Sequence, residues 1–124
     1  MSQMTQRILQ RLTMTASTAV ERGTLVKLGA AQGAVEQCDV QGEDAWGVAE
    51  HSADATETIS IIRGLVWVLA GANLSVGDDV TTGADSRVEA AGAGDVIIGK
   101  ALMSGADGEL VLIDTERRGA ISAS

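Results

Sequence analysis

Short apolar and alternating runs, separated by turns rich in glycine, aspartate and serine, make up most of this chain. Runs of this kind with many Val and Ile residues are typical of β-strands, and glycine readily adopts the φ > 0 conformations of tight turns. Residues 57–70 form the most β-rich stretch, which we expect to be two strands hinged at Arg63-Gly64. Residues 96–103 and 109–114 are expected to pair as a hairpin. The pattern predicts an all-β (mainly β) fold with little helix.

The remaining strands are expected to be short. One strand should lie near residues 9–15, and an extended polar arm should lead into it. Ile8 and Leu12 also fit one face of a helix, so the arm has a helical alternative. Further strands are expected at residues 25–28, 34–37, 45–50, 80–82 and 87–90.

The second half of the chain repeats the first at a nearly constant offset. Four residues recur 54 positions later, two recur 53 positions later and four recur 52 positions later. These pairs are Gly23/Gly77, Val26/Val80, Gly29/Gly83, Ala30/Ala84, Val35/Val88, Glu36/Glu89, Gly47/Gly99, Ala49/Ala101, Glu57/Glu109 and Ile61/Ile113. We therefore expect two duplicated halves, about residues 16–62 and 70–113, whose open sheets cover each other's apolar faces.

A chain of 124 residues is expected to form one domain. We divide it into an N-terminal arm (1–11), a single β domain (12–114) and a C-terminal tail (115–124). The core should be thin, because the chain has no Phe or Tyr and its aromatic residues are Trp46 and Trp67. Large side chains supply most of the free energy of burial, at roughly 25 cal/mol per Å² of apolar surface. The domain should therefore gain stability from oligomerisation.

Charge is distributed unevenly along the chain. The formal net charge is −8, but residues 21–114 hold sixteen acidic against five basic residues, a charge of −11. The two ends are basic, with Arg7 and Arg11 on one side and Arg117 and Arg118 on the other. An acidic body repels phosphates, so we expect no direct contact with nucleic acid.

No catalytic, cofactor or metal site is expected. Cys38 is the single cysteine, which excludes an intramolecular disulfide and a cysteine zinc cluster. His51 is the single histidine, and a solvated loop residue is a better interpretation than a metal ligand shared with Glu50 and Asp54. Residues 92–99 superficially resemble a phosphate-binding loop, but they lead into a strand instead of a helix.

The pattern contains no targeting or membrane segment. Residues 1–12 are polar and lack the apolar core of a signal peptide. The longest uncharged apolar run, residues 64–72, is far shorter than the ~20 residues that a membrane helix needs. We expect a soluble protein made in a cytoplasm, without membrane contact.

Six phrases of the sequence, in their order along the chain, resemble the capsid cement or head decoration proteins of tailed bacteriophages. They are residues 12–16 (LTMTA), 20–29 (VERGTLVKLG), 45–49 (AWGVA), 59–70 (ISIIRGLVWVLA), 76–80 (VGDDV) and 97–102 (IIGKAL). The resemblance covers about residues 12–114. It implies a small β-barrel or β-tulip, usually trimeric, that sits on the outer capsid surface at threefold and quasi-threefold positions. It also implies that the protein braces the shell against packaged DNA.

Such a protein would bind the major capsid protein and copies of itself. The candidate interface residues are the basic and apolar residues of the two ends and the two aromatic side chains. They are Arg7, Ile8, Leu9, Arg11, Trp46, Trp67, Arg117 and Arg118. For the tryptophans, and for Trp67 in particular, burial in the core is the competing interpretation.

A different class of protein remains as an alternative. Lys100, which lies in a predicted hairpin strand, makes a small β-barrel carrier domain with a modified lysine the alternative. Carriers hold that lysine at a tight turn, whereas Lys100 lies well before the next turn. A carrier would show added mass on this lysine, and a decoration protein would show none.

Overall fold

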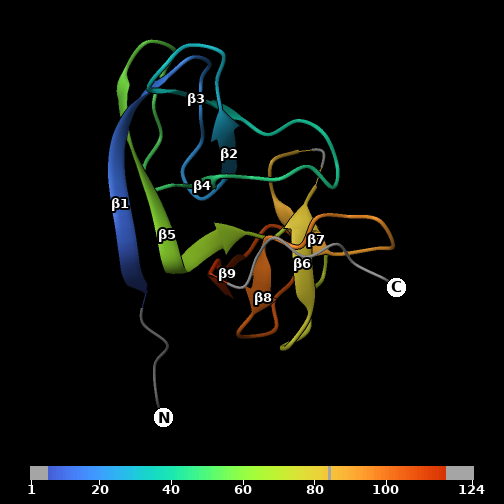
Figure 1. The fold of residues 1–124 in the computed structure, drawn as a ribbon. Helices are drawn as coiled ribbons and strands as arrows, with labels where there is room; N and C mark the ends of the chain where they lie inside the picture. The colour runs from blue at the N-terminus through green and yellow to red at the C-terminus, as the bar shows by residue number, and fades with distance from the viewer. Residues whose placement is uncertain (1–5, 84, 117–124) are drawn as a thin grey trace.

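The computed structural model describes residues 6–83 and 85–116. In this part the chain forms nine strands that are hydrogen-bonded in one sheet (Figure 1). The strands are β1 (Arg7–Ala16), β2 (Leu25–Leu28), β3 (Ala34–Gln37), β4 (Gly47–Ala49), β5 (Thr58–Leu69), β6 (Asp79–Thr82), β7 (Val88–Ala90), β8 (Gly99–Ala101) and β9 (Leu110–Asp114). The described residues include no helix long and apolar enough to cross a membrane.

The sheet closes on itself in two circuits that share β5. In the first circuit, β1, β3, β2, β4 and β5 pair in that order, and β5 pairs with β1 again. In the second circuit, β5, β9, β8, β6 and β7 pair in order, and a parallel bridge joins Val88 of β7 to Ala70 after β5. Figure 1 shows β5 running beside β1 and then turning toward β9.

The turn of β5 depends on Gly64. Its φ is 128°, and β1 has a register shift between Ile8 and Gln10 on the opposite side. A Cβ at Gly64 would lie 2.6 Å from the Arg7 carbonyl oxygen and 2.7 Å from the Leu9 nitrogen. Only glycine permits this approach of the two backbones. The expected pair of strands hinged here is therefore one strand, β5, that bends without ending.

The two halves have the same strand connectivity and the same register. Val26 pairs with Gly47 as Val80 pairs with Gly99. Two further strand pairs match in the same way. Residues 26–28 pair with residues 35–37 as residues 80–82 pair with residues 88–90. Residues 48–49 pair with residues 61–62 as residues 100–101 pair with residues 113–114. The offsets are those of the sequence repeat, and from them we infer an internal duplication.

Equivalent glycines make equivalent contacts. Gly23 and Gly77 have φ values of 83° and 91°. The Gly23 N–H donates to the Ala49 carbonyl at 2.9 Å, and the Gly77 N–H donates to the Ala101 carbonyl at 2.8 Å. Both glycines thus lie in the same kind of turn, with positive φ, just before the strand that follows, β2 or β6.

Two apolar clusters form the core. The first circuit encloses Val26, Val35, Ile59, Ile61 and smaller residues. The second circuit encloses a larger cluster to which the first half also contributes, so the halves share part of their core. No aromatic side chain is among the fully buried large residues of the described chain, in agreement with the expected thin core.

The all-β prediction is confirmed, and the predicted hairpin partners pair as β8 and β9. The β-barrel or β-tulip shape remains a prediction. The boundary of the N-terminal arm differs from the structure, because Arg7 to Arg11 belong to β1 and pair with β5. This pairing joins residues more than fifty positions apart and leaves no mark in the local pattern.

Candidate interaction surface

His51 serves the fold of its own loop. The ring lies between β4 and β5, with Nδ1 3.0 Å from the Ser52 carbonyl and Nε2 accepting the Ser60 N–H at 3.2 Å. Within residues 6–83 and 85–116, no group of three or more His, Cys, Asp or Glu side chains could hold a metal ion.

Cys38 and Lys100 are also held within the fold. Cys38 is buried, and burial raises the pKa of its thiol to about 12, so the thiol is neutral at pH 7. Lys100 lies in β8, where Nζ is 3.0 Å from Asp79 Oδ1 and donates to the Gly77 carbonyl at 3.1 Å. A lysine paired in mid-strand is not presented as the lysine of a carrier domain would be.

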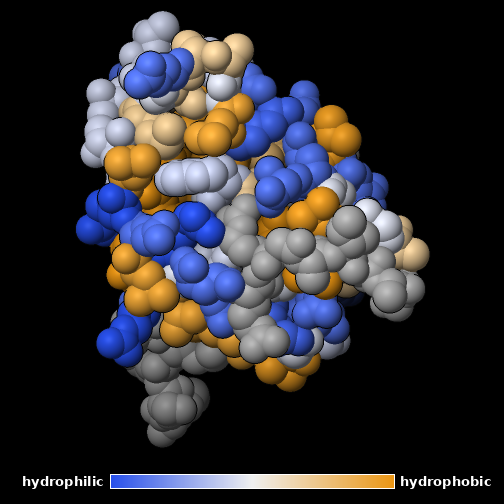
Figure 2. Space-filling model, in the orientation of Figure 1, coloured by the Kyte–Doolittle hydropathy of each residue, from blue (hydrophilic) through white to orange (hydrophobic). Residues whose placement is uncertain are grey.

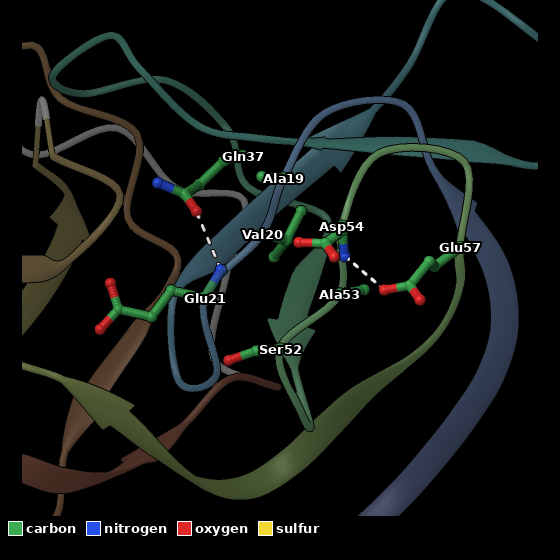
Figure 3. Close-up of a pocket in the computed structure, with 8 residues that line it drawn as sticks. All are labelled: Ala19, Val20, Glu21, Gln37, Ser52, Ala53, Asp54 and Glu57. Carbon is green, nitrogen blue, oxygen red and sulfur yellow. Dashed lines mark hydrogen bonds between the residues drawn. The ribbon is translucent and has the colours of Figure 1, made fainter.

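A hollow of about 460 Å³ lies between the chain after β1 and the loop before β5 (Figure 3). Its polar groups are used to close the loops. The Asp54 N–H donates to Glu57 Oε1 at 2.6 Å, and the Glu21 N–H donates to Gln37 Oε1 at 3.1 Å. In the second half, Glu109 at the equivalent position accepts the Ala106 N–H at 2.7 Å. Glu57 therefore has a structural role, which Glu109 repeats in the second half. The residues that line the hollow do not place a nucleophilic side chain next to a general base.

The start of β1 carries four of the expected interface residues. Arg7 and Leu9 are exposed, with Leu9 at 58%, whereas Ile8 is half-buried against the larger core cluster. Arg11 binds Glu50 through two contacts, Nε to Oε1 at 2.9 Å and Nη2 to Oε2 at 2.6 Å. Arg11, which we expected to reach a neighbour, is therefore engaged within its own chain.

This ion pair shifts the titration of both partners. The hydrogen bonds from Arg11 are the main cause of the lowered pKa of the Glu50 carboxyl, and the Ser60 hydroxyl, which donates to Oε1 at 2.8 Å, adds to it. The same contact raises the pKa of Arg11. Because the Arg11 side chain is 53% exposed, water and salt screen the interaction.

The two tryptophans lie in different places. Trp46 is half-buried against the smaller core cluster, and the Arg63 guanidinium lies 5.7 Å from the centre of its ring. Trp67 is half-buried in β5, opposite Leu112, and its backbone N–H donates to Gln6 Oε1 at 3.1 Å. Trp46 and Trp67 therefore do not form one surface. Arg117 and Arg118 lie outside the described residues.

Trp46 belongs to a group of partly exposed residues at one end of the first circuit, which we call the end patch. The members are Gln10, Leu12, Met14, Trp46 and Arg63. Alternation along β1 places Gln10, Leu12 and Met14 on the face that turns toward Ile59 and Ile61. Arg63 lies opposite Gln10 on β5, and its guanidinium lies over the Trp46 ring. Figure 2 shows hydrophobic residues interleaved with hydrophilic ones over β1, at the left of the view.

Four members of the end patch, Gln10, Leu12, Met14 and Arg63, were not among the expected interface residues. Leu12 is 50% exposed. Arg63 donates from Nη1 to Gln10 Oε1 at 3.4 Å, and its buried Nε has no hydrogen-bond partner among the described residues. The alternation of Gln10, Leu12 and Met14 was visible in the sequence, but the identity of the strand that would pair with it was not.

Comparison with known proteins identifies a family and solved structures of related fold. The family described as phage cement protein matches residues 4–114. The crystal structure of the head fiber gp8.5 N base in bacteriophage phi29 has a similar fold, with a TM-score of 0.74 and 20% sequence identity. The match covers 91% of this chain and 98% of that chain. No curated protein sequence matches this chain.

Proposed function

Because the chain belongs to the phage cement protein family, we propose that it is a capsid decoration protein that binds the outer surface of a phage head and stabilises the shell. The family match over residues 4–114 is the observation that carries this proposal. The family is structural, not a family of enzymes, and it places the protein on the virion at the capsid surface.

Stabilisation follows from selective binding. A protein that binds the assembled shell more tightly than its separated subunits lowers the free energy of the assembled state by mass action. The closed hydrogen-bond circuits suit this role, because a stiff body that contacts neighbouring subunits resists their separation when packaged DNA presses outward. The acidic body, with a charge of −11 over residues 21–114, is suited to a protein surface and not to the DNA.

A homotrimer at threefold and quasi-threefold positions is the assembly that we propose. The thin core supports it, since the largest fully buried residues of the described chain are Leu and Ile. Such a core leaves stability to be gained from contacts between copies. Residues 1–5 and the basic residues Arg117 and Arg118 are proposed to add contacts with a neighbouring copy or with the major capsid protein.

The test uses heads of the phage that encodes the chain, prepared without the decoration protein. The purified protein should co-sediment with these heads, and decorated heads should survive heating to a higher temperature than bare heads. Protein that fails to bind, or that binds without raising the temperature of head rupture, contradicts the proposal. Lys100→Gln is the control for the carrier alternative: head binding should be unchanged, and the wild-type chain should have its unmodified mass in intact mass spectrometry.

A further inference from the structure

The end patch has an equivalent in the second half of the molecule. Its three apolar residues, Leu12, Met14 and Trp46, occupy the positions of Val66, Val68 and Ile98. Pairing supports each equivalence: Leu12 is opposite Ile61 as Val66 is opposite Ile113, and the N–H groups of Trp46 and Ile98 donate to Val26 and Val80.

In the second half this end is closed. Val66, Val68 and Ile98 are 0%, 0% and 2% exposed. They share a core cluster with apolar residues of the first half, and Ile98 lies with three of these, Leu25, Ala45 and Val48, around a void of only about 10 Å³. The first half therefore covers the open end of the second half. No described residue covers the equivalent end of the first half in the same way, since Leu12 is 50% exposed.

We propose that the end patch docks on the shell protein of the phage head, through a site that offers an apolar side chain beside a carboxylate. The apolar side chain would cover Leu12 and the edge of Trp46, as the first half covers Val66 and Ile98. The carboxylate would meet Arg63, which has no ion-pair partner among the described residues. This inference rests on the proposed function and identifies the surface that performs it.

A second copy of this chain could cover the end patch in two ways, and both are unfavourable. In the first, the second half of another copy would cover the end patch as the first half covers the second half within one chain. The residues that take the places of Leu25 and Val48 there are Asp79 and Lys100, which form an ion pair at 3.0 Å. That surface is charged where an apolar one is needed, and burying it would desolvate the pair.

The other route is contact between the end patches of two copies. It would bring the Arg63 side chains of both copies together, and like charges in a desolvated contact oppose association. A different protein that places a carboxylate at Arg63 has neither cost. The two costs to a second copy thus favour the shell protein, the partner that the proposed function supplies.

The experiment compares two end-patch variants with one control for binding to heads that lack the decoration protein. Leu12→Ser removes the exposed apolar side chain, and Arg63→Glu reverses the charge. Val76→Ser is the matched control, because Val76 is a 65% exposed aliphatic residue on a turn of the second half. Circular dichroism melting and light scattering after size exclusion establish the fold and the oligomeric state of each variant. Leu12→Ser should fold normally, because half of the side chain is already in water.

We expect both variants to bind heads more weakly than wild type by more than about five-fold, with the oligomeric state unchanged. The control should bind as wild type does. Wild-type-like binding by both end-patch variants overturns the inference but not the proposed function. A changed oligomeric state with unchanged head binding also overturns it, because the patch would then join copies. If wild type itself fails to bind, the proposed function fails together with the inference.

Discussion

Gly99 shows at the scale of one residue why the two halves carry glycine at matching positions. A Cβ at Gly99 would lie 2.6 Å from the Asp114 carbonyl oxygen and 2.8 Å from Ile113 Cγ2. At the equivalent Gly47, a Cβ would lie 2.6 Å from Ile61 Cγ2. Each glycine lets its strand pass close over the β-strand beside it, so the repeat in the sequence reflects a repeated steric requirement.

Gly99→Ala should therefore lower the free energy of unfolding by about 1–3 kcal/mol, because the methyl group meets a backbone oxygen that cannot move aside. Gly92→Ala is the control, since the nearest atom to its Cβ, Asp95 Oδ2, is at an ordinary 3.5 Å. Urea unfolding of the two variants measures the difference. Equal urea midpoints for the two variants would show that the close approach at Gly99 does not affect stability.

The Arg11–Glu50 pair predicts a pH dependence of stability. The pKa of Glu50 is lowered from 4.5 in the folded chain, so its ionised form stabilises the fold above that value, and this contribution is lost as the pH falls through the lowered pKa. Glu50→Gln should melt at a slightly lower temperature than wild type at pH 7. The difference should shrink as the pH is lowered below 4.5 and through the lowered pKa of Glu50. A difference that stays constant as the pH falls would contradict the ionic origin of the effect.

At the scale of elements, the sequence predicted which segments form strands better than it predicted where each strand begins and ends. Gly, Asp and Ser turns placed most strands correctly, because turn chemistry is local. The extension of β1 back to Arg7 was missed, since it depends on pairing with Leu65 far along the chain. The end patch was missed for the same reason: whether Leu12 is covered is decided by tertiary packing and not by the alternation that places it on one face.

Truncation separates the proposed arm from β1. Deleting residues 1–5 leaves every described pair of β1 in place, so the protein should fold normally, and head binding should weaken if these residues act as an arm. Deleting residues 1–11 also removes the pairing of Arg7, Ile8, Gln10 and Arg11 with β5. The longer deletion should cost more than about 1 kcal/mol of stability through lost strand pairing and lost burial of Ile8. Thermal melting of both truncations measures this, and equal melting temperatures would contradict a structural role for residues 6–11.

At the scale of the whole molecule, two repeats share one strand and part of one core. Because β5 belongs to both circuits and the larger cluster contains residues of both halves, the domain should unfold in a single transition. Trp46 and Trp67 report on different circuits, so Trp67→Phe and Trp46→Phe each leave one local fluorophore. In each variant the fluorescence midpoint in urea should equal the circular dichroism midpoint. Separate midpoints would mean that the halves are independent units.

Electron cryomicroscopy shows directly whether this chain decorates the outside of a phage head. Heads prepared without the protein are imaged before and after its addition. We expect added density on the outer surface at threefold and quasi-threefold positions, into which this β fold fits with the end patch toward the shell. Heads that gain no density, or gain it on the inner surface, would contradict a role in decoration.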